Sequence, residues 1–175
     1  MTKQLQKINE TLEKLLEEKD IFKRKRNENR EKAKQFFSKS KIARQHRDEV
    51  NEKIQALKAE RSIYFKERDA KQAEKKDLIK RLEASDDNAE KKQLYQQLLV
   101  VKEELKECRA KADAAHQAVQ DLAHQSQEYH LEMKTYIQLG KQAHGIADEL
   151  HPKVVNISKT IMKTFKERDK LQNQG

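Results

Sequence analysis

A seven-residue repeat of apolar and small side chains limits what this chain can fold into. From Leu5 to Leu82 the repeat keeps one frame for eleven heptads, with two inner positions, a and d, three and four residues apart. Basic residues interrupt the a positions, but Lys and Arg stems can lie along a helix seam while their charges reach water. A repeat of this length with charged residues outside it predicts a coiled coil. The d positions are Ile8, Leu15, Phe22, Asn29, Phe36, Ala43, Val50, Leu57, Tyr64, Lys71 and Leu78.

A second frame runs from Leu94 to Leu171, and a cluster of turn and cap-forming residues, Ala84-Ser85-Asp86-Asp87-Asn88, separates the two frames near the midpoint. We therefore predict an all-α fold, a long antiparallel two-helix coiled-coil hairpin that forms one domain over residues 1–175. Arm one is 3–84, the turn 85–88 and arm two 89–172. A parallel dimer of unbroken helices is the alternative.

The antiparallel register pairs residues whose numbers sum to 176, because a then faces d and large side chains face small ones. The pairs include Leu82 with Leu94, Leu78 with Leu98, Leu57 with Val119, Ile54 with Leu122 and Phe36 with Gly140.

Pro152 lies within the second frame. Proline removes one helical hydrogen bond and clashes with the carbonyl four residues earlier, so we expect arm two to be kinked near Asp148. The alternative is a break at His151, with Pro152 opening a separate short helix.

The composition argues against an enzyme. Charged residues make up 39% of the chain, so burial is confined to one narrow seam and no enclosed catalytic pocket is expected. No Gly-rich phosphate loop, catalytic carboxylate pair or Ser-His-Asp arrangement can be traced. We predict a non-enzymatic protein without catalytic residues or cofactors.

The longest aliphatic run, Leu98–Val101, is far too short to cross a bilayer, and the first residues have no apolar signal region. The single cysteine, Cys108, occupies a d position, where packing is a better explanation than nucleophilic chemistry. One cysteine cannot form an internal disulfide, which fits a reducing compartment. We predict a cytoplasmic protein that does not bind membranes.

His144, Asp148 and His151 share one helical face at spacings that suit three metal ligands. Their exposure and their neighbours Gly145 and Pro152 favour an ordinary surface, so no metal site is predicted.

Basic residues are concentrated in one part of the chain. Between Lys19 and Arg47 there are twelve Lys or Arg and three acids, a local excess equal to the net charge of +9 of the whole chain. In the predicted hairpin, a second basic stretch, Lys153 to Lys170, lies beside the first at the open end. The heptad position e contains no acid in either arm, but includes Phe37, Phe65 and Tyr95.

A basic strip with interspersed aromatic rings suits a phosphate backbone, since cations release counterions and rings stack on unpaired bases. The alternative is that this row of charged side chains is simply solvated and binds no partner. The predicted RNA-binding residues are Lys23, Arg24, Lys25, Arg26, Arg30, Lys34, Phe37, Lys41, Arg44 and Lys58.

Three segments, Arg47–Arg61, Ala110–His116 and Ala147–His151, resemble archaeal coiled-coil proteins related to the eukaryotic nuclear-segregation (brefeldin-resistance) family. The resemblance covers about residues 40 to 155. It implies association with polysomes and messenger ribonucleoprotein.

Together these features predict a ribosome- or RNA-associated protein that binds structured RNA through the basic open end. A protein partner at the turn or along the hairpin, and dimerisation, are compatible with the sequence. The alternative function is a structural scaffold that binds other proteins.

Overall fold

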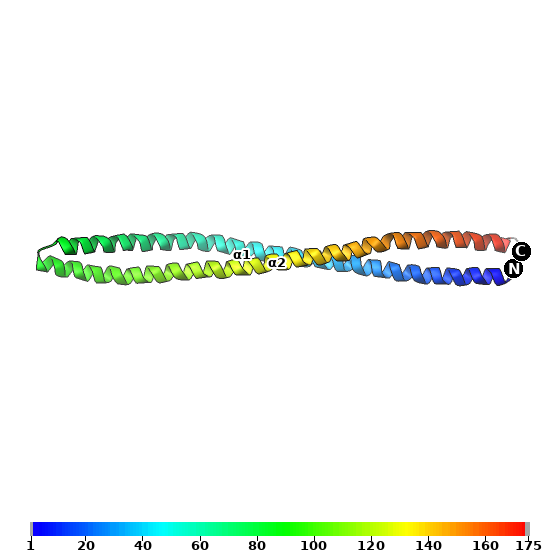
Figure 1. The fold of residues 1–175 in the computed structure, drawn as a ribbon, viewed down its shortest axis with the longest axis horizontal. Helices are drawn as coiled ribbons and strands as arrows, with labels where there is room; N and C mark the ends of the chain where they lie inside the picture. The colour runs from blue at the N-terminus through cyan, green and yellow to red at the C-terminus, as the bar shows by residue number, and fades with distance from the viewer. Residues whose placement is uncertain (1, 174–175) are drawn as a thin grey trace. The chain divides into compact units, whose positions relative to one another are not determined.

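The structure is a computed structural model that describes residues 2–173, and these residues form two long helices joined by a short turn (Figure 1). Helix α1 is Thr2–Ala84 and helix α2 is Asn88–Asn173, and the two pack against each other. No strand is present in this part of the chain. The predicted all-α helical hairpin is confirmed, and the turn is one residue shorter than expected.

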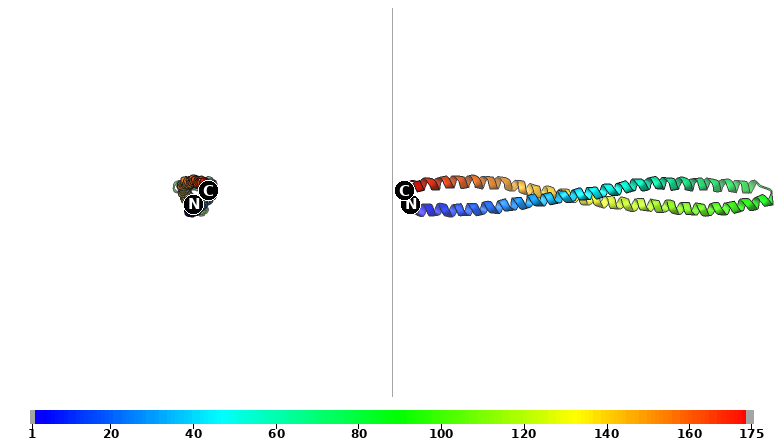
Figure 2. Two further views of the ribbon diagram at one scale, coloured as in Figure 1. Left: turned by 90° about the vertical axis from the view of Figure 1, so that its right-hand side faces the viewer. Right: turned by 180° about the vertical axis from the view of Figure 1, so that it is seen from behind.

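The contacts divide the hairpin into two compact units, which both helices traverse. Unit 1 is Met1–Ala43 with Leu131–Gly175, and unit 2 is Arg44–His130. In each unit one segment of α1 lies antiparallel to one segment of α2, as the right-hand view of Figure 2 shows. Unit 2 contains the turn, and unit 1 contains both ends of the described chain.

The heptad frame correctly identifies the residues that are buried. Every buried hydrophobic side chain occupies a predicted a or d position, from Leu12 in α1 to Ile161 in α2. In unit 2 one cluster joins Leu78, Leu94, Leu98 and Val101, with Ile79 and Leu82 packed against it. A second cluster joins Val50, Ile54 and Val119, with Leu57, Leu122 and Tyr129 packed against it. Burial of this apolar seam is what holds the two helices together.

Contacts between the helices agree with the predicted register to within a few residues. The pairs Leu78 with Leu98 and Leu57 with Val119 each fall in one cluster. Ser126 donates a hydrogen bond to Asn51 over 2.8 Å, one residue from the predicted pairing. In unit 1 the predicted partner of Gly140 needs correction.

The ring nearest Gly140 belongs to Phe37 and not to Phe36. A Cβ atom added at Gly140 would lie 2.8 Å from Cε1 of Phe37, so the glycine is what allows this ring to approach the helix. Phe36 instead stacks on Tyr136, with ring centroids 6.4 Å apart and planes at 22°. The a/d pattern missed this because a ring at the flanking e position is long enough to reach across the seam.

Side-chain hydrogen bonds fix the turn, Ser85–Asp87. Asp87 caps α2, because its Oδ1 accepts a bond from the Ala89 N–H over 3.0 Å. The buried Ser85 hydroxyl donates to Glu90 Oε2 over 2.6 Å and accepts from the Asp87 N–H over 3.3 Å. No non-glycine residue in the described chain has a positive φ, so the reversal needs no glycine.

Helix α2 continues through Pro152. The alternative of a break at His151 is therefore wrong, and the bend near Asp148 stays a prediction. Pro152 is exposed, so its ring displaces no residue of the seam.

The two glycines of α2 provide a matched test of the packing around Phe37. Gly145→Ala should raise the free energy of unfolding by about 0.5–1 kcal/mol, because alanine is the better helix former and nothing lies within 4 Å of the added methyl. Gly140→Ala should lose this gain, because its methyl meets the Phe37 ring. Urea unfolding followed by circular dichroism measures both.

In a Phe37→Ala background the obstacle is gone, and Gly140→Ala should become as stabilising as Gly145→Ala. Equal gains from both glycine substitutions in the wild-type background would contradict the observed Phe37 contact.

The cap of α2 can be tested separately. Asp87→Ala should lower the free energy of unfolding by about 1 kcal/mol, since it leaves the Ala89 N–H without its acceptor. Asp86→Ala, at the neighbouring exposed turn position, is the matched control and should have little effect. The same loss in both variants would argue against the cap.

Candidate nucleic-acid interface

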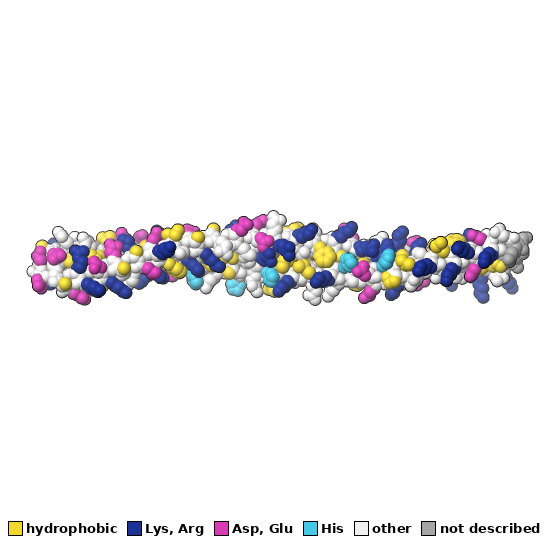
Figure 3. All heavy atoms as spheres, turned by 90° about the horizontal axis from the view of Figure 1, so that it is seen from above, with side chains coloured by type: hydrophobic (Ala, Val, Ile, Leu, Met, Phe, Trp, Pro, Cys, Tyr) yellow, Lys and Arg dark blue, Asp and Glu magenta, His cyan; other side chains and the backbone are white. Residues whose placement is uncertain are grey.

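The two units differ sharply in charge. Unit 1 contains 21 Lys or Arg and 12 Asp or Glu, whereas unit 2 contains 18 of each. The net charge of +9 therefore belongs to unit 1 alone. On the face drawn in Figure 3, the half that includes the chain ends has dark blue side chains with few magenta ones, and the half that includes the turn is mixed.

The excess is concentrated in α1 from Lys23 to Lys41, which we call the basic segment. It contains nine cations and two acids, Glu28 and Glu31. Glu31 lies 3.6 Å from Lys34, and both side chains are more than half exposed, so the pair neutralises little. The segment presents a positive surface to solvent.

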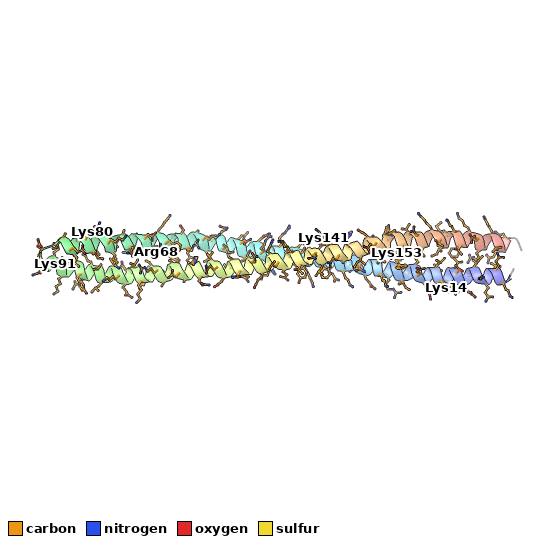
Figure 4. All side chains as sticks on the ribbon, viewed as in Figure 1. Lys14, Arg68, Lys80, Lys91, Lys141 and Lys153 are labelled. Atoms are coloured by element: carbon orange, nitrogen blue, oxygen red, sulfur yellow. The ribbon has the colours of Figure 1, made fainter. Side chains whose placement is uncertain are left out.

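The cations of the basic segment flank the seam on both sides. Lys23 and Arg30 occupy heptad position e, and three further lysines, Lys25, Lys32 and Lys39, occupy position g. Neither position holds an acid in this segment or in residues 137–153 of α2. Lys153 extends the pattern from α2, with its Nζ 5.7 Å from the centre of the Phe22 ring. Figure 4 labels Lys153 in this unit.

The aromatic rings of unit 1 take part in packing. Phe37 is half-buried against Gly140, and Lys39 Nζ lies 5.6 Å from the centre of the Tyr136 ring. The hydrogen bond from Tyr136 to Glu132 raises the pKa of the tyrosine. The ring expected to be free at Phe37 for base stacking instead packs between the two helices, and most of the exposed charged groups of the segment are cations.

His151 of α2 lies against Arg26 of the basic segment. Arg26 Nη1 lies 3.3 Å from His151 Nδ1, so Arg26 donates when this nitrogen carries no proton. Arg26 is half-buried, and it also bonds Asn27.

The three residues considered as metal ligands do not converge. His144 Nδ1 lies 2.9 Å from Asp148 Oδ2, whereas His151 Nδ1 faces Arg26. Within residues 2–173 no three His, Cys, Asp or Glu side chains are grouped as metal ligands would be.

The predicted RNA-binding residues fall into both units. Eight lie in unit 1, and of these only Arg26 and Phe37 are half-buried. Arg44 and Lys58 are exposed residues of unit 2. Lys58 lines a groove of about 390 Å³ there, together with Arg47 and His130, and no acid lines this groove. The acid-free side of the helix pair, formed by position e of both arms, therefore continues into unit 2, although that unit has no net charge.

The opposite flank of unit 2 contains an ion-pair network that the heptad frame missed. Lys71 Nζ lies 2.7 Å from Glu104 Oε2 of α2 and 2.9 Å from Glu74 Oε2. The bond to Glu104, and then the bond to Glu74, raises the pKa of Lys71. The sequence feature that could have predicted this network is a lysine at a d position, because the charge of such a residue needs a partner beside the seam.

Neither helix has a stretch within residues 2–173 that is long and apolar enough to cross a membrane. Comparisons with models of protein families, with curated proteins and with solved structures find no match for this chain.

Proposed function

We propose that this chain is a non-enzymatic, cytoplasmic RNA-binding protein that associates with ribosomes or other structured RNA through the basic segment of unit 1. The observation that carries the proposal is the division of charge between two units of the same hairpin. Equal packing requirements along a coiled coil give no reason for one unit to hold the whole excess of +9. A polyanionic partner for unit 1 does give such a reason.

The chemistry of the segment favours the phosphate backbone over the bases. Its exposed charged groups are mostly lysines and arginines, and the Phe37 ring packs against Gly140. Cations that replace counterions on phosphates supply affinity without reading sequence. We therefore expect recognition of RNA shape and charge, with strong dependence on salt.

The choice of ribosomal or messenger ribonucleoprotein as the source of that RNA rests on the resemblance described above, through segments such as Arg47–Arg61. It is a narrower proposal than RNA binding and is tested separately by sedimentation with ribosomes at low and high salt.

A charge reversal in each unit tests RNA binding. The variant Lys23→Glu/Arg30→Glu/Lys34→Glu should bind a structured RNA, such as purified ribosomal RNA, at least tenfold more weakly in fluorescence anisotropy. The slope of log K against log salt should also fall by about 2, because each lost phosphate contact removes roughly 0.7–0.9. Circular dichroism should show unchanged helicity, since Lys23, Arg30 and Lys34 are all exposed.

The matched control reverses three exposed lysines of unit 2, in Lys66→Glu/Lys76→Glu/Lys80→Glu, with the same change in net charge. It should retain most of the affinity. Equal losses in both variants would show a response to net charge alone and would remove the assignment to unit 1. Absence of binding even at low salt would remove the proposal and leave the scaffold alternative.

A further inference from the structure

A second surface, in unit 2, combines cations with exposed apolar side chains. On α2, residues spaced three and four apart form one helical face that contains no acid, and we call this face the basic stripe. Tyr95 and Leu99 are 53% and 49% exposed at its centre. The members of the stripe are Lys92, Tyr95, Leu99, Lys102, Lys106 and Arg109.

The stripe retains its positive charge and its apolar surface in the isolated chain. Lys106 lies 3.1 Å from Glu103, but both side chains are about two-thirds exposed or more, so the pair is weak. Arg109 donates to Gln72, a neutral partner, over 3.1 Å. The stripe differs from the basic segment of unit 1, where Phe37 and the other rings pack inward. Exposed tyrosine and leucine side chains gain little from phosphate, and they suit an apolar partner with acidic neighbours.

The same chain contains a surface with the opposite chemistry, which we call the acidic face. On α1 in unit 1 four exposed carboxylates recur at spacings of three and four residues, and Leu16 and Ile21 beside them are 41% and 45% exposed. None of the four forms an ion pair with another residue of the described chain, and Gln6 donates a long bond of 3.5 Å to Glu10. The face ends at Arg24. Its members are Glu10, Glu13, Leu16, Glu17, Asp20 and Ile21.

We propose that the basic stripe of one copy binds the acidic face of a second copy, so that the chain self-associates through helix-to-helix contacts. The two faces are opposite in charge sign, and each has two large exposed apolar side chains. Leu16 and Ile21 lie at the two edges of the acidic face, five residues apart. Packing one of these edges against Tyr95 and Leu99 would bury apolar surface, while the charged residues set the partner and the alignment.

Because the two faces are different, the contact is heterologous, and each copy can both offer and receive one. A contact of a few helical turns lies below about 1,200 Å², the size of weak and transient interfaces. We therefore expect association in the micromolar range that rises with concentration and weakens with salt. This inference can be tested apart from RNA binding, because neither face includes any of the ten predicted RNA-binding residues.

Sedimentation equilibrium of the full, nuclease-treated chain at rising concentration tests the proposal. The wild type should increase in average mass, and Leu99→Ser should need about tenfold more protein to reach the same mass, because its apolar contact is lost. Val100→Ser is the matched control. It changes the neighbouring aliphatic residue, which is 59% exposed but lies off the stripe. It should behave as the wild type.

Charge reversal supplies the decisive comparison. Lys102→Glu/Lys106→Glu and Glu13→Lys/Glu17→Lys should each be monomeric alone, and an equimolar mixture of the two should associate again. In the mixture, the unchanged acidic face of the first variant can bind the unchanged basic stripe of the second. The reversed stripe of the first variant can likewise bind the reversed face of the second, because both signs have changed. Circular dichroism confirms that each variant stays helical.

A wild type that stays monomeric at all concentrations, association that survives either reversal, or a mixture that fails to associate would each overturn the proposal. Equal effects of Leu99→Ser and Val100→Ser would also overturn it, because the apolar contact would then not belong to the stripe.

Discussion

Burial of a single narrow seam between α1 and α2 is the interaction on which the whole structure depends. Every buried hydrophobic residue lies at an a or d position, and many of them are alanine. Small residues such as Ala112 and Ala147, both fully buried, let the helices approach closely. With 39% charged residues the chain has no second apolar layer to bury, so the remaining side chains stay in water.

The two flanks, which are the rows of side chains on either side of the seam, differ in their charged residues. In unit 2 one flank carries the ion-pair network of Lys71, Glu74 and Glu104, and the other contains no acid. In unit 1 both flanks of the basic segment are free of acids. A helix pair gives each flank a separate straight row of positions, so one chain can hold a phosphate-binding surface and a protein-binding surface without a pocket.

Several side chains have a dual role at the boundary between seam and flank. Arg26 lies at an a position and reaches His151, while Lys71 lies at a d position and reaches Glu104. Their stems follow the seam and their charged ends leave it, which keeps the charges hydrated or paired. Similarly, Phe37 starts on a flank and ends over Gly140. These residues connect the packing of the helices to the charge of the surface.

The sequence by itself determined the two helices, the position of the turn and the residues of the seam. These follow from local spacing: the heptad frame separates buried from exposed positions, and Asp87 provides the cap that starts α2. It also determined where the positive charge is concentrated. The tertiary structure alone decided that Phe37 rather than Phe36 covers Gly140, that His151 meets Arg26 instead of a metal-binding group, and that Lys71 bridges to α2. Those outcomes depend on how far a side chain reaches across to the other helix and on which rotamer the close approach leaves open, and a repeat written along one chain contains neither quantity.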